Sequence, residues 1–133
     1  MAALVCLQGG GEFARACRDL DLAVLRSVLA DRPVVALPAA AAPGGEYVTA
    51  GRNAARHYRS LTGEVAVVAP DPRDDPEGAT RAVEAAGLLV LPGGSPSRLH
   101  DVLVGTPLGG LVTQRHDAGE LVVSGASAGA MVL

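Results

Sequence analysis

Residues 88–94 read Leu-Leu-Val-Leu-Pro-Gly-Gly, a short apolar run closed by a proline and two glycines. A continuously apolar run of this length, bounded by turn residues, is typical of a buried strand in a parallel sheet. Similar runs recur along the chain, at residues 4–7, 34–37, 64–69 and 121–124. Because segments with helical periodicity separate them, we predict a three-layer α/β sandwich with a mainly parallel sheet of about five strands.

The segments between these strands are predicted to be helices. They span residues 12–30, 46–61, 77–86 and 96–116, the last in two pieces divided around Gly105-Thr106-Pro107. In the first helix, a spacing of 3.6 residues predicts that one apolar face packs on the sheet. That face would carry Phe13, Ala16, Cys17, Leu20, Val24 and Val28.

The composition predicts one folded domain over residues 1–133 and excludes several classes of protein. Hydrophobic residues make up 49% of the chain and charged residues 19%, which excludes a disordered polypeptide. All 11 basic residues are arginines, and the net charge is −3. Since aromatic residues are only 2%, neither phosphate-backbone binding nor base stacking is expected, and no nucleic-acid partner is predicted.

The sequence also bears on the compartment. The N-terminal segment lacks the basic and apolar regions of a secretory signal, and no segment approaches the ~20 apolar residues needed to cross a bilayer. We therefore predict a cytoplasmic protein with no membrane partner. The two cysteines, Cys6 and Cys17, are interpreted as small core residues rather than as a disulfide framework.

The main chemical motif is Gly125-Ala126-Ser127-Ala128-Gly129, which follows an apolar strand. It matches G-x-S-x-G, the sharp strand-to-helix turn that presents a nucleophilic serine above a sheet. Small residues are needed on either side because the turn is tight, and the following helix directs N–H groups at a developing oxyanion. Ser127 is the candidate nucleophile and the Ala128 N–H a candidate oxyanion donor. The alternative is a glycine-lined helix start capped by the serine.

The glycine pair after strand 88–91 supplies a second candidate. In an open parallel sheet the carboxyl ends of the strands line the active crevice, so the Gly94 N–H could be the second oxyanion donor. The alternative is an ordinary glycine turn.

Together these residues resemble peptidase family S51, the serine hydrolases that include cyanophycinases and dipeptidase E and have a flavodoxin-like, class I glutamine amidotransferase-like fold. The resemblance runs from Gly93-Gly94 to Ala130, and Gly9-Gly10-Gly11-Glu12, Tyr47 and Asp74-Asp75 also fit. It implies Ser127 as nucleophile, and Gly94 and Ala128 as the oxyanion hole. It further implies a small peptide or isopeptide substrate, aspartyl ones included, with no cofactor or metal, in a protein that can form homo-oligomers.

The chain departs from that family pattern at three places, one of which is Ala126, where cyanophycinases tend to have threonine. Ser95 stands where the family usually has asparagine or aspartate, which makes it a candidate substrate contact. The family's histidine and acid follow the nucleophile, whereas only six residues follow Ser127. We therefore expect a fragment or a truncated product, incomplete at its C-terminus, inactive as given and prone to self-association through an uncovered sheet edge.

The histidines within the chain are not predicted to act as the base. His57 is expected on a helix surface, and His100 and His116 on helices that cover the sheet beside Asp101 and Asp117, from which they would point apart. Asp71, Asp74 and Asp75 are expected in a solvated loop with a helix cap rather than in a metal site.

Three other functions remain open at the level of sequence. Gly9, Gly11 and Ala14 fit the loose dinucleotide pattern G-x-G-x-x-A, but strand 34–37 lacks the acidic residue at its end that the pattern requires. A glutaminase would need a cysteine at position 127. The third is a non-catalytic remnant or a small-molecule-binding α/β domain.

Overall fold

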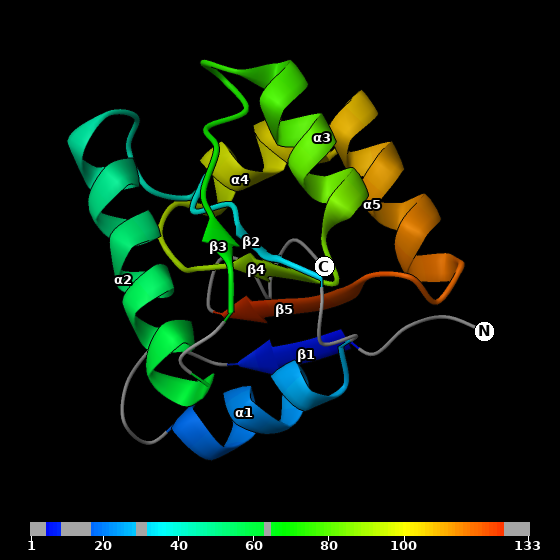
Figure 1. Cartoon of the computed structure of the whole chain (residues 1–133). Coiled ribbons are helices and arrows are strands. Elements are labelled where there is room, and N and C mark those ends of the chain that lie inside the picture. The colour runs from blue at the N-terminus through cyan, green and yellow to red at the C-terminus, as the bar shows by residue number, and fades with distance from the viewer. Residues whose placement is uncertain (1–4, 9–16, 29–31, 63–64, 127–133) are drawn as a thin grey trace.

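The computed structural model describes residues 5–8, 17–28, 32–62 and 65–126. Its centre is a five-stranded parallel sheet with the strand order β1-β5-β4-β2-β3 (Figure 1). The strands are β1 (Val5–Gln8), β2 (Val34–Ala36), β3 (Val67–Val68), β4 (Leu88–Leu91) and β5 (Val122–Ala126). The predicted α/β class and mainly parallel sheet are confirmed.

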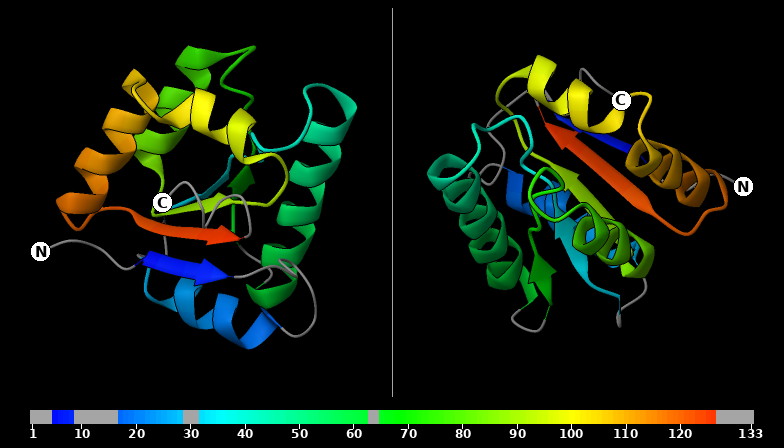
Figure 2. Two further views of the ribbon diagram at one scale, coloured as in Figure 1. Left: turned by 180° about the vertical axis from the view of Figure 1, so that it is seen from behind. Right: turned by 90° about the horizontal axis from the view of Figure 1, so that it is seen from above.

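Helices cover both faces of the sheet. α1 (Arg18–Arg26) and α2 (Gly45–Thr62) lie on one face, and α3 (Pro76–Ala85), α4 (Pro96–Leu103) and α5 (Pro107–Asp117) lie on the other (Figure 2). The strand residues alternate between the two cores, since Leu89 and Val123 pack towards α3–α5 while Val90 and Val122 pack towards α1 and α2. This arrangement is the predicted three-layer sandwich.

Three helices of the chain begin with the same local signal, a capping side chain followed by proline. Asp75, Ser95 and Thr106 are the N-caps of α3, α4 and α5, and each is followed by a proline in the first turn. The cap oxygen accepts a hydrogen bond from a backbone N–H that the helix leaves unpaired, and proline needs no partner there. The predicted division of residues 96–116 into two helices is confirmed.

The observed strand ends differ from the predicted ones in ways that concern the site. β5 continues to Ala126, two residues beyond the predicted end, because its backbone stays paired with both β1 and β4. β3 is only two residues long, shorter than the predicted 64–69, and it lies at the sheet edge beside β2.

The predicted apolar face of α1 is wrong at one position. Leu20 is 45% exposed, whereas its neighbour Asp21 is 1% exposed and faces the sheet together with Val24. Periodicity places either residue 20 or residue 21 near the buried face, and hydrophobicity alone favours the leucine. The Asp21 carboxylate takes the buried position because the side chains of Gln8 and His57 hydrogen-bond to it there.

The order of the strands places the topological switch point of the sheet between β2 and β4. The chain runs from β2 outward to β3 on one side, and from β4 outward to β5 on the other. In doubly wound sheets the connections then leave the carboxyl ends in opposite directions, and ligands bind at this switch point. The loops that follow β2 and β4 therefore flank the position where a ligand is expected to bind.

The remaining expectations concern membranes and cysteines. No helix in the described part of the chain is long and apolar enough to cross a membrane. Cys6 is buried in the core beneath α1 and α2, as predicted, whereas Cys17 is only partly buried at the N-cap of α1.

Candidate active site

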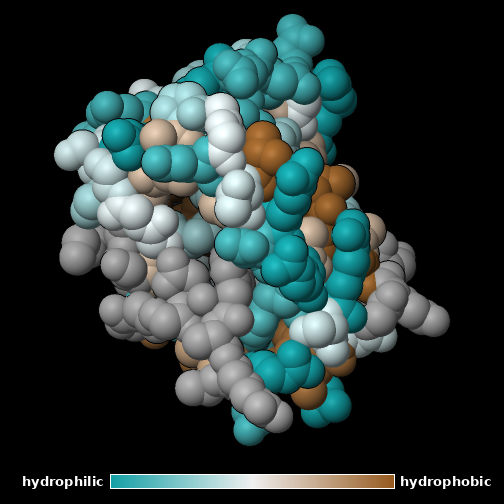
Figure 3. Space-filling view, turned by 90° about the vertical axis from the view of Figure 1, so that its left-hand side faces the viewer, coloured by the Kyte–Doolittle hydropathy of each residue, from teal (hydrophilic) through white to brown (hydrophobic). Residues whose placement is uncertain are grey.

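The carboxyl ends of three strands lie side by side at one edge of the sheet. Gln8 at the end of β1 pairs with Ala126 at the end of β5, and Leu91 at the end of β4 pairs with Gly125. The arrowheads of these strands point to the same side of the molecule in Figure 1. Seen from that side, the described residues are mostly hydrophilic with small apolar patches between them (Figure 3). This register places the carboxyl ends of β4 and β5 next to each other.

Gly94 occupies the switch point itself. Its φ is +144°, and a Cβ at this position would lie 2.5 Å from the Ala40 carbonyl oxygen. The neighbouring Ser95 N–H donates to the same oxygen at 2.8 Å, so the loop after β4 is fastened to the loop after β2. Only glycine fits such a close approach of two backbones without strain.

The Gly94 backbone is also chemically available. The residue is exposed, and no hydrogen bond among the described residues uses its N–H. A rigid, accessible N–H at the carboxyl end of a central strand has the properties of an oxyanion donor, because it needs no reorganisation when negative charge develops. The other two predicted members of the site, Ser127 and Ala128, lie outside the described residues.

Ser95 is the N-cap of α4, with its Oγ 3.5 Å from the Arg98 N–H. At this length the capping bond is weak, and the side chain is only partly buried. Its predicted substrate contact is not tested by this geometry.

The three histidines are found in three different environments. His100 is exposed on α4, 3.7 Å from Asp101, and His116 near the end of α5 is 3.4 Å from Asp117. The expectation that these neighbouring side chains point apart is therefore wrong. His116 precedes the amino end of β5, so it lies away from the carboxyl edge.

The surface prediction for His57 is wrong, since only 7% of the residue is exposed. Its Nε2 lies 2.6 Å from Oδ2 of Asp21, and its ring meets that of Tyr58 edge-on, with the centroids 5.1 Å apart. The charged neighbours Arg56 and Arg59 suggest a solvated stretch, but the helix turns position 57 inward. Helical spacing from buried Ala54 and Tyr58 is the signal that could have identified it.

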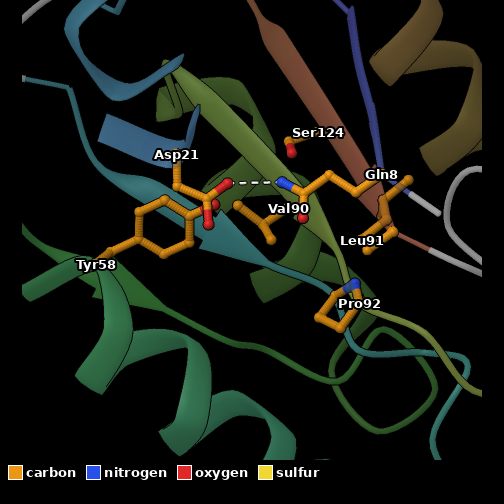
Figure 4. A pocket seen from close by; sticks show the side chains of 8 residues that line it. Gln8, Asp21, Tyr58, Val90, Leu91, Pro92 and Ser124 are labelled. Atoms are coloured by element: carbon orange, nitrogen blue, oxygen red, sulfur yellow. Dashed lines mark hydrogen bonds between the residues drawn. The ribbon is translucent and has the colours of Figure 1, made fainter. Parts of the chain in front are cut away.

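Asp21 is the centre of a buried polar cluster that the sequence analysis did not predict. Its second oxygen, Oδ1, accepts a hydrogen bond of 2.6 Å from Nε2 of Gln8 (Figure 4). Beside them lies a small cavity lined by Gln8, Asp21, Tyr58, Val90, Leu91, Pro92, Ser124 and Ala126. Burial raises the pKa of the Tyr58 hydroxyl strongly, and the nearby Asp21 charge adds to the effect.

A second polar group lies at the carboxyl end of β3. The Tyr47 hydroxyl donates to the Pro70 carbonyl at 2.5 Å, and the Arg73 guanidinium lies over the Tyr47 ring and pairs with Asp71 at 2.9 Å. Burial, followed by the Asp71 charge, raises the pKa of Tyr47. Asp75 caps α3 through a 2.9 Å bond from the Gly78 N–H, so the expected cap in this acidic loop is confirmed.

Within the described ranges, no group of three or more His, Cys, Asp or Glu side chains could hold a metal ion. The carboxyl edge offers a rigid backbone donor, the Gly94 N–H, in the loop that follows β4. Such an edge suits chemistry in which the protein's own groups stabilise an anionic intermediate.

Comparisons with known proteins yield structural neighbours and nothing at the level of sequence. No family profile and no curated protein matches the chain. Among solved structures, a peptidase from an acI-B1 Actinobacterium is similar over 100% of this chain and 57% of its own, with a TM-score of 0.83 and 24% identity. A protein named "Putative Peptidase E Protein" from Listeria monocytogenes EGD-e is similar over 97% of this chain and 60% of its own, with a TM-score of 0.71 and 22% identity.

These likenesses establish the fold at identities below 25%. The chain spans less than two thirds of the length of either neighbour. The chain therefore shares with both neighbours a parallel α/β fold.

Proposed function

We propose that this chain carries the nucleophile and the oxyanion hole of a serine-type peptidase resembling family S51. The observation that supports it most is the register of β4 and β5, which places Leu91 opposite Gly125. The loop of Gly94 thus follows one strand and the Gly125–Gly129 motif follows its neighbour. Both solved neighbours are named as peptidases, which supports the same reaction class.

In the proposed reaction, the Ser127 hydroxyl attacks the carbonyl carbon of a small peptide or isopeptide, including aspartyl substrates. The N–H groups of Gly94 and Ala128 donate to the oxyanion of the tetrahedral intermediate. Collapse expels the amine and leaves an acyl-serine, which water then hydrolyses. An unassisted serine is a poor nucleophile, so the reaction needs a general base. By the family resemblance, a histidine and an acid following the nucleophile in the full-length protein supply it.

The test is labelling of the full-length gene product with a fluorophosphonate probe, followed by mapping of the modified peptide. We expect the label on Ser127, and we expect Ser127→Ala to abolish both labelling and peptide hydrolysis while folding is nearly unchanged. Ser97→Ala is the matched control, because Ser97 is exposed on α4 and has no role in the proposal. Hydrolysis retained by Ser127→Ala would overturn the nucleophile assignment.

A further inference from the structure

The buried cluster of Gln8, Asp21 and His57 joins three elements that are distant in sequence. Gln8 closes β1, Asp21 lies in the first turn of α1, and His57 lies in the last two turns of α2. The side chains of Asp21 and His57 are 2% and 4% exposed, and Gln8 is 7% exposed. A carboxylate removed from water to this degree is costly unless its oxygens are hydrogen-bonded.

Both oxygens of Asp21 are satisfied by side chains. A carboxylate only accepts hydrogen bonds, so the two 2.6 Å contacts place hydrogens on Nε2 of Gln8 and on Nε2 of His57. The position of Asp21 in the first turn of α1 adds the favourable field of the helix N-terminus. The carboxylate is therefore held in one place by α1 and α2, and it holds the Gln8 amide in turn.

The orientation of the Gln8 amide has a consequence at the carboxyl edge. With Nε2 donated to Asp21, Oε1 is buried and has no hydrogen-bond partner among the described residues. The adjacent cavity, about 10 Å³ and lined also by Val90, Leu91 and Ala126, is large enough for one water molecule (Figure 4). A buried unpaired acceptor costs about 1–3 kcal/mol. The Gln8–Asp21 bond is therefore the contact whose role is to be explained.

The neighbour of Gln8 in the sheet indicates what that is. Gln8 pairs with Ala126, the residue that directly precedes Ser127. β1 lies at the sheet edge and is paired on one side only, so its backbone alone does not fix its carboxyl end. The hydrogen bond between the Gln8 side chain and Asp21 adds a restraint on this end, from the face of the sheet that α1 and α2 cover.

We propose that Asp21 is a positioning residue, which through Gln8 fixes the paired carboxyl ends of β1 and β5 and thereby sets the place of the residue after Ala126. As a step in catalysis this rests on the proposed function, because it is Ser127 that would be positioned. As a statement about the two strand ends it stands independently and can be measured independently.

The decisive variants exchange the carboxylate and the amide. Gln8→Glu breaks the Gln8–Asp21 bond, since it faces carboxylate against carboxylate with no donor between them. Asp21→Asn alone keeps a hydrogen bond, since amides both donate and accept, and it serves as the control for the substitution at position 21. The double variant restores it with reversed polarity, because the new amide at position 21 would donate to the new carboxylate at position 8 and still accept from His57. Gln8→Met removes only the amide and keeps the Asp21–His57 pair, so it serves if a charge-altering variant fails to fold.

Hydrogen exchange followed by mass spectrometry measures the positioning in the full-length protein. We expect Gln8→Glu and Gln8→Met to raise exchange by about tenfold in peptides covering 5–8 and 123–133, with little change in α3–α5 and little change in Asp21→Asn. The double exchange should return both peptides to the wild-type rate. Arg115→Met is the matched control, because Arg115 is also buried but bonds to the carbonyls of Val83, Ala86 and Glu120, at the opposite end of β5 from Ala126.

The rate of fluorophosphonate labelling at Ser127, measured on the same variants, separates the two proposals. We expect a loss of about tenfold or more in Gln8→Glu and Gln8→Met, because small misplacements of a nucleophile are costly, and recovery in the double variant. Uniform exchange changes across the chain, or the same pattern in Arg115→Met, would overturn the positioning role. A wild-type protein that is never labelled but shows the local exchange pattern would overturn the proposed function alone.

Discussion

Asp21 and Arg115 are two buried charges on opposite faces of the sheet, and they are satisfied in different ways. Arg115 is 7% exposed, and its guanidinium donates to the carbonyls of Val83 and Ala86 and lies 3.6 Å from Glu120. It thereby pairs the carbonyls at the end of α3, where a helix lacks partners of its own. Asp21 instead accepts from two side chains, one of which has an unpartnered oxygen facing a cavity.

The difference separates a structural charge from one with a further role. A charge bonded to backbone carbonyls joins α3 and α5, away from the carboxyl edge of the sheet. The Asp21 cluster lies at the carboxyl edge of the sheet, beside the end of β5, and keeps a costly acceptor. The experiments below alter each charge in turn.

The largest effect is expected from Asp21→Ala. It leaves the His57 and Gln8 donors without their acceptor, and breaking a buried pair in this way costs about 3–5 kcal/mol. Urea denaturation measures the loss. Asp19→Ala is the control, because Asp19 is an exposed carboxylate in the same helical turn and should change stability by about 0.5 kcal/mol or less. Equal effects of the two variants would contradict the buried cluster.

Arg115→Met is expected to cost about 2–3 kcal/mol, because two buried carbonyls lose a charged donor. The aliphatic part of the side chain is retained, so little packing is lost. Glu120→Gln is the control for the exposed side of the ion pair and should cost about 0.5 kcal/mol or less. Thermal unfolding of both variants measures these costs. If Arg115→Met also lowered the rate of fluorophosphonate labelling at Ser127, Arg115 and Asp21 would not differ in the proposed way.

The pH dependence distinguishes the Asp21 side of the sheet further. Burial raises the pKa of Tyr58 above its ordinary value of 10.0, so the unfolded chain releases this proton at a lower pH than the folded one. The contribution of the Tyr58 hydroxyl to stability is therefore fully present below about pH 10 and is lost above it, by up to about 1.4 kcal/mol per pH unit for each such group.

Tyr47 shares this behaviour, so the variants are compared one at a time. Tyr58→Phe should make the free energy of unfolding fall less steeply with pH in the alkaline range, by the contribution of the Tyr58 hydroxyl. Tyr47→Phe should do the same by the contribution of the Tyr47 hydroxyl. Urea denaturation between about pH 9 and about pH 11, on either side of the ordinary tyrosine pKa, provides the measurement. An unchanged alkaline slope in both variants would mean that neither hydroxyl is held neutral by burial.

The same contrast explains what could be predicted from the sequence. The runs at 34–37 and 88–91 are apolar throughout, so their strands follow from hydrophobicity, and the cap–proline pairs mark the helix starts. The turn at Gly94 can be predicted because a glycine pair directly after a buried strand indicates a tight turn. The contact of Gly94 with Ala40 cannot be predicted, since it depends on which strands are neighbours in the sheet.

The Asp21 cluster escapes prediction for a related reason. Its members lie 13 and 36 residues from Asp21 along the chain, and each alone is an ordinary polar residue. Periodicity assigns burial from hydrophobicity, so it selects Leu20 over Asp21 and gives His57 to the surface. Only the packing of α1 against α2 brings the three side chains together and makes their burial tolerable.

The smallest effect is expected where a polar side chain contributes little to stability but lies next to Gly94. Ser95→Ala removes a capping contact of 3.5 Å and should cost about 0.5 kcal/mol or less, at the low end for a helix cap. Thr106→Ala removes the cap of α5, where Oγ1 lies 3.1 Å from the Gly109 N–H and also donates to Val102 at 2.7 Å. It should cost about 1 kcal/mol, the typical value for such a cap.

The pair of variants then decides between a cap and a substrate contact. If Ser95 only caps α4, neither variant changes peptide hydrolysis by the full-length protein by more than its small effect on thermal unfolding explains. If Ser95 contacts the substrate, as its place beside Gly94 suggests, Ser95→Ala raises KM although it is the less destabilising of the two. The two caps would then differ in their effect on KM and not only in their effect on stability.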